Sequence, residues 1–273
     1  MTSTTTVPAA KLPARDAQEW ATRVDLAACY RLIDRYGMSD MVYNHITARI
    51  PGRENEYLIN AYGYRYDEIT ASNLYKIDIE GNVLAKPDTR YGITPAGYII
   101  HSAVHSARPD AGCVIHTHAR ASMAVSMLEC GFLPLSQHAM RFYGNVSYHD
   151  YGGPAADLAE RAKLIANLGD NQVMFLRNHG LLVVAPSIPE AFNMVYWIEM
   201  ACKAQLDAMA TGAELVIPAE EARVLTADLL QPKDPGKKLS LDLYDEEVRR
   251  PYGVMEWEAM IRLLDRDSPG FRD

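Results

Sequence analysis

Apolar residues recur along the first part of the chain in two periods, one typical of helices and one typical of strands. A helical period follows Asp16, which forms a start resembling a capping box with Glu19, and it ends at Gly37. Residues 44–50 then alternate between polar and apolar, as a strand does. Further strands are expected at 56–60, 74–79 and 83–84. This region is therefore expected to form one helix followed by a small sheet.

The middle of the chain predicts helices that alternate with short buried strands. Thr94 and Pro95 open a helix that should run to Ala107, and residues 112–117 read as a buried strand. Further helices are expected at 119–129, 154–168 and 187–210, and a strand pair at 173–176 and 181–184. This alternation favours a layered α/β fold.

The two ends of the chain have a different character. Residues 1–15 are polar and contain proline, which predicts a flexible arm. From about residue 211 to 240 scattered prolines and charges predict an irregular extension, and residues 246–265 read as an interrupted helix. We expect a single domain over residues 16–273 that includes this extension.

Composition narrows the functional classes. The chain has 273 residues, 48% of them apolar and 23% charged, as in ordinary soluble proteins. A net charge of −8 without a basic stripe argues against nucleic acid and membrane surfaces as partners. The scattered cysteines predict buried thiols in a reducing compartment, and no apolar leader is visible, so a cytoplasmic protein is expected.

Three histidines have the spacing of a metal site. His116 and His118 lie two apart on a predicted strand, so both side chains project to the same side, about 7 Å apart. His179 lies in a tight turn between apolar strands, where an imidazole has no packing use. The alternative is a chance pair of histidines at a surface edge. Three neutral ligands would leave an open position on the ion, which is typical of catalytic rather than structural sites.

Several segments around these histidines resemble the class II aldolase/adducin superfamily. They are PAGYIIHSAVHSARPDAGCVIHTHARASMAVS, FLRNHGLLVV, MVYNHITARI and YHDYGG, and the likeness runs from about residue 24 to residue 210. The resemblance implies a three-layer αβα sandwich, usually a cyclic homotetramer with its sites at subunit interfaces. It also implies that His116, His118 and His179 are metal ligands. Zinc is the expected metal, with iron, manganese, cobalt or nickel as alternatives.

The departures from the family pattern concern catalysis and substrate. Aldolases of this family carry a catalytic glutamate at the start of the helix before the His-x-His strand, and Gly97 stands there. Asn44 is retained from the family's phosphate cradle, but the serine pair of that cradle is replaced by Pro95 and Ala96. The resemblance therefore implies a substrate without a phosphate group.

His138 is the expected catalytic residue. It falls where the aldolases place a tyrosine that reaches a neighbouring subunit's site as an acid. An imidazole titrates near neutral pH and can act as acid, base or metal ligand, so His138 is expected to replace the tyrosine or complete a fourth metal bond. The alternative is a polar interface histidine.

Three residues are expected to bind substrate. Asn44 and His45 lie where the aldolases bind theirs, although His45 is also compatible with a strand surface. Arg177 is expected either to hold an anionic substrate group or to form a local salt bridge. Asp150 and Glu68 are candidate partners for the second N–H of a ligand imidazole.

The expected function is that of a metal-dependent lyase on a non-phosphorylated carbonyl or carboxylate compound, with cleavage of a carbon–carbon bond through a metal-stabilised enolate. A non-haem iron oxygenase on the same scaffold is one alternative. An adducin-like interaction module that retains its metal site without catalysis is another. Small molecules and a second copy of the chain are the expected partners.

Overall fold

A single mixed sheet of eight strands runs through the computed structural model, which describes residues 16–153, 158–231 and 253–273. The strand order is β4-β3-β2-β1-β5-β8-β7-β6, and every neighbouring pair is antiparallel except β6 and β7. The strands are β1 His45–Arg49, β2 Glu56–Ile59, β3 Tyr75–Asp78, β4 Val83–Ala85, β5 Cys113–Thr117, β6 Val146–His149, β7 Val173–Leu176 and β8 Gly180–Ala185.

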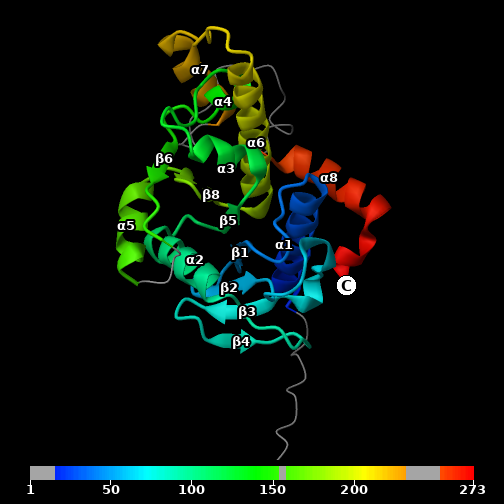
Figure 1. Ribbon diagram of the computed structural model, residues 1–273. Helices are drawn as coiled ribbons and strands as arrows, with labels where there is room; N and C mark the ends of the chain where they lie inside the picture. The colour runs from blue at the N-terminus through cyan, green and yellow to red at the C-terminus, as the bar shows by residue number, and fades with distance from the viewer. Residues whose placement is uncertain (1–15, 154–157, 232–252) are drawn as a thin grey trace, which may run out of the picture.

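Helices cover both faces of this sheet, which makes the fold a three-layer αβα sandwich, as the family resemblance implied (Figure 1). The helices are α1 Ala17–Arg35, α2 Pro95–Ala107, α3 Arg120–Ser126, α4 Gln137–Met140, α5 Leu158–Leu168, α6 Ile188–Ala210, α7 Glu220–Leu230 and α8 Val254–Asp267. Short 3-10 turns are η1 Tyr66–Glu68, η2 Ala71–Asn73 and η4 Pro269–Arg272. The helices α2 and α5 pack on one face of the sheet, α1, α3 and α6 pack on the other, and α8 packs against α1 and α6.

The alternation in β1 places one side of the strand against each helical layer. Ile46 and Ala48 belong to the core under α1 and α6, whereas Thr47 contacts α2. The hydroxyl of Tyr30 in α1 donates to the carbonyl of Ile46 at 2.6 Å and accepts its N–H at 2.8 Å. Because a buried phenol needs such partners, this pair fixes α1 at the centre of the sheet.

Most predicted elements are confirmed, and the differences have physical reasons. The structure adds β6 and α4 in the stretch around residues 130–150, where short segments left no clear period. It also replaces part of the expected irregular stretch with α7, a helix without buried residues. An exposed helix buries no apolar stripe, so its sequence has only a weak helical period. The scattered prolines and charges therefore led to the prediction of an irregular stretch. Predictions for residues 1–15, 154–157 and 232–252 lie outside the described residues.

The structure also bears on two expectations from composition, one about the cysteines and one about membranes. Cys29, Cys113 and Cys202 are buried free thiols, but Cys130 is exposed, so the expectation of uniformly buried cysteines was wrong for that residue. It lies in the loop after α3, where the chain turns at the surface. Across the described ranges no helix is both long and apolar enough to cross a membrane. The cellular compartment remains a prediction.

Candidate metal centre

Three imidazoles converge at one edge of the central strands. His116 lies near the end of β5, His118 directly follows that strand, and His179 lies in the turn between β7 and β8. The Nε2 atom of His118 lies 3.2 Å from that of His116 and 2.9 Å from that of His179. Ligand atoms of all three lie within 4.8 Å of one another. Two tetrahedral ligands with metal–nitrogen bonds of 2.0–2.1 Å lie about 3.3 Å apart, so the geometry matches a single ion.

The hydrogen bonds behind the rings decide which nitrogens face the centre. His116 Nδ1 lies 3.0 Å from the carbonyl oxygen of Leu181, and His118 Nδ1 lies 2.9 Å from Oδ2 of Asp40. A carbonyl and a carboxylate only accept, so both Nδ1 atoms carry the proton and both Nε2 atoms present lone pairs. Lone pairs 3.2 Å apart repel each other unless a cation lies between them. The donor set therefore fits a divalent metal ion.

Burial keeps two of these histidines, His116 and His179, in the neutral form that binds metal. Desolvation, together with the neighbouring histidines, holds the pKa of His116 well below its usual value. The same causes lower the pKa of His179 to about 4. A protonated imidazole cannot ligate, so both rings are ready to bind at neutral pH without first losing a proton.

The turn that carries His179 is shaped by two neighbours of that residue. Asn178 adopts a φ of +57°, a left-handed conformation that asparagine tolerates better than most residues. A Cβ on Gly180 would collide with the carbonyl oxygen of Thr117 and lie 3.4 Å from Cε1 of His116. Glycine at this position therefore lets β8 approach β5 closely enough to bring the third ring to the other two.

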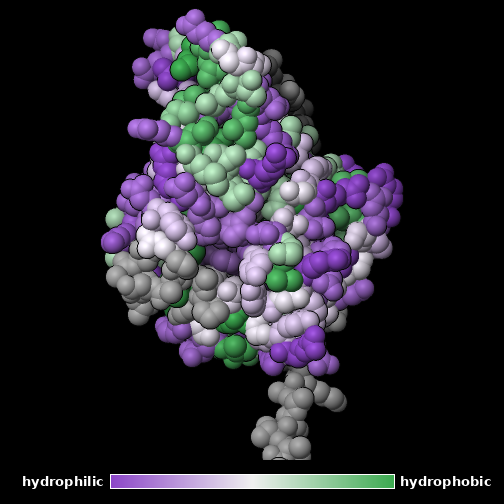
Figure 2. Space-filling view, viewed as in Figure 1, coloured by the Kyte–Doolittle hydropathy of each residue, from purple (hydrophilic) through white to green (hydrophobic). Residues whose placement is uncertain are grey.

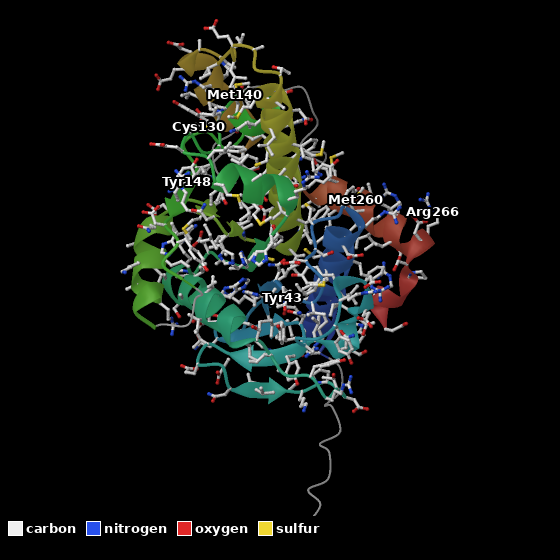
Figure 3. All side chains as sticks on the ribbon, viewed as in Figure 1. Tyr43, Cys130, Met140, Tyr148, Met260 and Arg266 are labelled. Carbon is white, nitrogen blue, oxygen red and sulfur yellow. The ribbon has the colours of Figure 1, made fainter. Side chains whose placement is uncertain are left out.

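A strained loop before β1 supplies the remaining polar contacts. Met41 and Asn44 have φ values of +46° and +71°, which non-glycine residues rarely adopt. Asn44 Oδ1 accepts the backbone N–H of His118 at 3.3 Å, while its buried Nδ2 has no partner. Exposed Tyr43 lies between them in sequence, near the middle of the molecule (Figure 3). Such strain is typical of functional loops.

Asp40, in the same loop, is the partner of a candidate ligand imidazole that the sequence reasoning missed. Asp150 and Glu68 were the expected partners of a ligand imidazole. The Glu68 carboxylate instead accepts the backbone N–H of Arg65 at 2.8 Å, and Asp150 lines a small cavity beside His179. Nothing local distinguishes Asp40, because its contact with His118 spans 78 positions in the chain.

The expected substrate residues lie in different places. His45 is buried directly opposite His116 in the β1–β5 pairing, with the ring centroids 5.5 Å apart. Arg177 lines the cavity beside His179, and its guanidinium donates to the carbonyl of Leu128 at 2.5 Å and lies 4.2 Å from the centre of the Tyr148 ring. Within the described part of the chain, the Arg177 guanidinium thus contacts a carbonyl and a ring and forms no salt bridge. Its role toward substrate remains a prediction.

His138 lies apart from the three ligands within one subunit. It belongs to α4 and stacks on Trp197 at 4.2 Å between ring centroids, with the Arg141 guanidinium 4.8 Å from the same Trp197 ring. Among the described residues, the group able to hold a metal contains only His116, His118 and His179. A role for His138 in a neighbouring subunit's site remains a prediction.

Comparison with known proteins extends these observations. Residues 24–206 match the family model described as the Class II Aldolase and Adducin N-terminal domain. A Caulobacter vibrioides protein named for aldolase class 2 is 42% identical, over 93% of both chains. Alpha-adducin of Mus musculus is 37% identical over 92% of this chain but only 34% of its own length.

Solved structures agree with this family at the level of the fold. The crystal structure of an aldolase II superfamily protein from Pseudomonas syringae superposes with a TM-score of 0.83 and 43% identity, and covers 95% of this chain and 98% of its own. L-fuculose 1-phosphate aldolase from Glaciozyma antarctica gives a TM-score of 0.78 at 23% identity, with 96% and 97% of the two chains covered. The second likeness concerns the fold alone.

Proposed function

This chain belongs to the class II aldolase and adducin family, and from that premise we propose that it is a divalent-metal-dependent enzyme acting on a small carbonyl or carboxylate compound. The convergence of three ring nitrogens carries the proposal, because in His116 and His118 the proton is fixed on Nδ1 and Nε2 presents a lone pair. Such a site binds a cation and leaves coordination positions free for oxygen ligands. Zinc is the proposed metal.

The proposed reaction is cleavage of a carbon–carbon bond in a lyase. A bound divalent ion polarises a carbonyl and stabilises the negative charge of an enolate. The protein contributes an oriented donor beside it, since the buried Nδ2 of Asn44 has no partner while its Oδ1 is held by His118. A buried amide donor in this position is suited to hold a substrate oxygen.

The substrate is proposed to lack a phosphate group. Pro95 and Ala96 begin α2, and neither residue has a side-chain hydroxyl or amide for a phosphate oxygen. Pro95 also lacks a backbone N–H, which removes a donor from the helix N-terminus. A sugar-phosphate substrate is therefore disfavoured, and a carboxylate or simple carbonyl compound is proposed instead.

A second copy of the chain is the proposed partner. Exposed apolar side chains gather at the end of the molecule where α4 and α7 lie (Figure 2). They are Val216, Ile217, Val224 and Leu225. Large apolar surfaces of this kind mark interaction sites. We propose that this end packs against a neighbour in a homotetramer, and that His138 in α4 acts there as the proton donor of the neighbouring site.

The test of the metal site is an elemental analysis of protein purified without added metal. We expect close to one transition-metal ion per subunit, lost in His116→Ala while the circular dichroism spectrum is retained. A wild-type protein without stoichiometric metal would refute the enzyme proposal. Iron in place of zinc would favour an oxygenase on the same scaffold.

The test of His138 compares two variants in the metal-loaded protein. His138→Ala is expected to abolish lyase turnover without loss of metal, whereas Arg141→Lys, at the residue that follows the same helix, should retain turnover. Wild-type turnover by His138→Ala would contradict its role as proton donor. It would leave an interface histidine stacked on Trp197 as the explanation of this residue.

A non-catalytic module is the second candidate function, and one observation favours it. The 37% identity to mouse alpha-adducin extends over 92% of this chain, so adducin contains a domain of this type within a longer protein. The elemental analysis separates the two candidates, because a module of this kind would not need the ion that the three ligands are arranged to bind.

A further inference from the structure

A row of polar residues runs between α2 and β1, starting next to the metal centre. Gly97, His101 and His105 are spaced four residues apart, so they lie on one face of α2. His101 and His105 both contact Thr47 of β1, and Gly97 lies against His45. A helix and a strand packed in a core normally meet through apolar side chains. A polar row at this position therefore needs a physical reason.

Gly97 is what makes room for His45. A Cβ on Gly97 would lie 2.8 Å from Cγ of the His45 ring and 2.9 Å from its Cδ2. Real Cβ atoms do not approach other carbons so closely. The His45 imidazole thus occupies the space that a side chain at position 97 would need, and the two residues form a matched pair.

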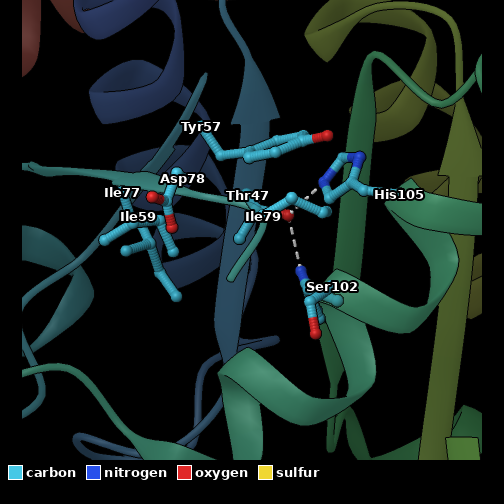
Figure 4. Close-up of a pocket in the computed structure, with 9 residues that line it drawn as sticks. Thr47, Tyr57, Ile59, Ile77, Asp78, Ile79, Ser102 and His105 are labelled. Carbon is cyan, nitrogen blue, oxygen red and sulfur yellow. Dashed lines mark hydrogen bonds between the residues drawn. The ribbon is translucent and has the colours of Figure 1, made fainter. Parts of the chain in front are cut away.

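Hydrogen bonds hold the ring behind His45 in one orientation. His105 Nδ1 lies 3.1 Å from the carbonyl of Ala111 and must donate to it, so His105 Nε2 accepts from the Thr47 hydroxyl at 2.7 Å. The Thr47 oxygen then accepts from His101 Nδ1 at 2.6 Å. Figure 4 shows both bonds of Thr47. The proton of each hydrogen bond in this row is thereby assigned, and the carbonyl of Ala111 sets the donor-to-acceptor direction of all of them.

His45 lies between this row and the metal ligands. Its ring centroid is 4.3 Å from that of His101 on one side and 5.5 Å from that of His116 on the other. The side chain is 4% exposed, and its Nε2 has no hydrogen-bond partner. A buried nitrogen without a partner is rare in folded proteins and indicates a ligand or water that completes it. Oxygen ligands of the neighbouring metal are the groups at hand.

We propose that His45 is a hydrogen-bonding but non-ligating imidazole of the metal centre, which fills the space left by Gly97 and contacts an oxygen ligand of the metal, either water or substrate. The row of His101, Thr47 and His105 positions its ring. This inference rests on the proposed metal site. It assigns to this chain's own β1 a polar group on the α2 side of the ion, whereas His138 would have to arrive from a neighbouring subunit.

The first experiment tests the pairing in the metal-free protein, where the metal proposal plays no part. Gly97→Ala is expected to lower the melting temperature because its Cβ meets the His45 ring. In a His45→Ala background the same change should cost less than half as many degrees. Thr94 Cγ2 also lies 2.7 Å from the position of this Cβ. Thr94→Ser removes that methyl group and is therefore the matched control for the His45→Ala background. Equal losses in the wild-type and His45→Ala backgrounds would overturn the pairing.

The second experiment tests the contact with the oxygen ligand. Cobalt(II) replaces the native metal, and acetate is titrated while the visible absorption spectrum of the cobalt is recorded. His45→Phe keeps the ring volume but removes both nitrogens, and it should weaken acetate binding at least tenfold. His45→Gln, which keeps a polar atom near the position of Nε2, should restore most of the affinity. Thr47→Val should weaken acetate binding less, because it removes the hydrogen bond that holds the His101 ring beside His45.

The outcomes separate this inference from the metal proposal. Cobalt binding by wild type and His45→Phe with the same spectrum and the same acetate affinity would refute the role of His45 and leave the metal site intact. Failure of wild type to bind cobalt at a one-to-one ratio would refute the metal site and, with it, the contact proposed for His45. The temperature measurements would still decide whether Gly97 and His45 are paired.

Discussion

Removal of the Asp40 carboxylate tests how far a residue outside the ligand set controls the metal centre. Asp40 Oδ2 lies 2.9 Å from His118 Nδ1, and its side chain is 40% exposed. A partly exposed hydrogen bond of this kind contributes little to folding. Its effect should instead fall on the ligand, because the carboxylate holds the proton on Nδ1 and keeps Nε2 free to bind metal.

Loss of such an outer partner typically costs 10–100-fold in metal affinity. For Asp40→Ala we therefore expect a 10–100-fold weaker zinc affinity, equivalent to about 1.4–2.7 kcal/mol. The other two ligands remain in place, since His116 is oriented by the carbonyl of Leu181 and not by a carboxylate. The loss should therefore be partial, unlike that of His116→Ala.

The assay is competition for zinc against a chromophoric chelator, with the melting temperature of the metal-free protein measured in parallel. Asp265→Asn is the control, because it removes a carboxylate from the Arg272 ion pair, which the end of α8 makes with η4. It should change neither zinc affinity nor melting temperature by much. A change of less than twofold in zinc affinity for Asp40→Ala would refute the argument that Asp40 fixes the His118 tautomer.

The remaining predictions concern the framework around the site. The pKa of His105 is lowered to about 3, first by burial and then by the charge of Arg49. The unfolded chain binds this proton near pH 6.5, so acidification favours unfolding, by about 1.4 kcal/mol per pH unit below 6.5 until about pH 3. Urea denaturation at pH 7 and pH 5 should show this loss, and His105→Gln should show less of it. Buried Glu199 accepts the N–H groups of Ala121 and Ser122 at 3.1 and 2.9 Å, so Glu199→Gln should lower the free energy of unfolding by about 1–3 kcal/mol in the same assay, whereas an unchanged value would show that these bonds add nothing. Gly180→Ala should cost about 1–3 kcal/mol of stability and also weaken zinc binding, since its Cβ would press on the end of β5; normal zinc affinity would show that β8 can move away without cost to the site.

The elements that formed as predicted share a strong local signal. Asp16 caps α1 through the N–H groups of Gln18 and Glu19, as its position before the helical period indicated. Ser187 caps α6 in the same way. Where the chain makes short or exposed elements, as in β6, α4 and α7, such signals are weak, and the sequence alone did not predict them.

The convergence of the three histidines was predictable because strand geometry is local. Two histidines two residues apart on a strand must share a face, and a histidine in a tight turn with Gly180 is presented at a strand end. The amino-acid order therefore determined which residues could bind a metal. Spacing alone left the alternative of a chance pair, and the family resemblance implied that all three residues are ligands.

The surroundings of those ligands were decided by the tertiary structure. Asp40 meets His118 across 78 positions, and Gly97 meets His45 through the packing of α2 on β1. At Gly97, where the aldolases carry a glutamate, the space that a side chain would need is taken by the His45 ring of β1. No local pattern encodes such contacts, because they depend on how far a helix and a strand approach each other once the core has closed. The amino-acid sequence determined which histidines could bind a metal ion. The packing of the folded chain determined which carboxylate and which ring contact them.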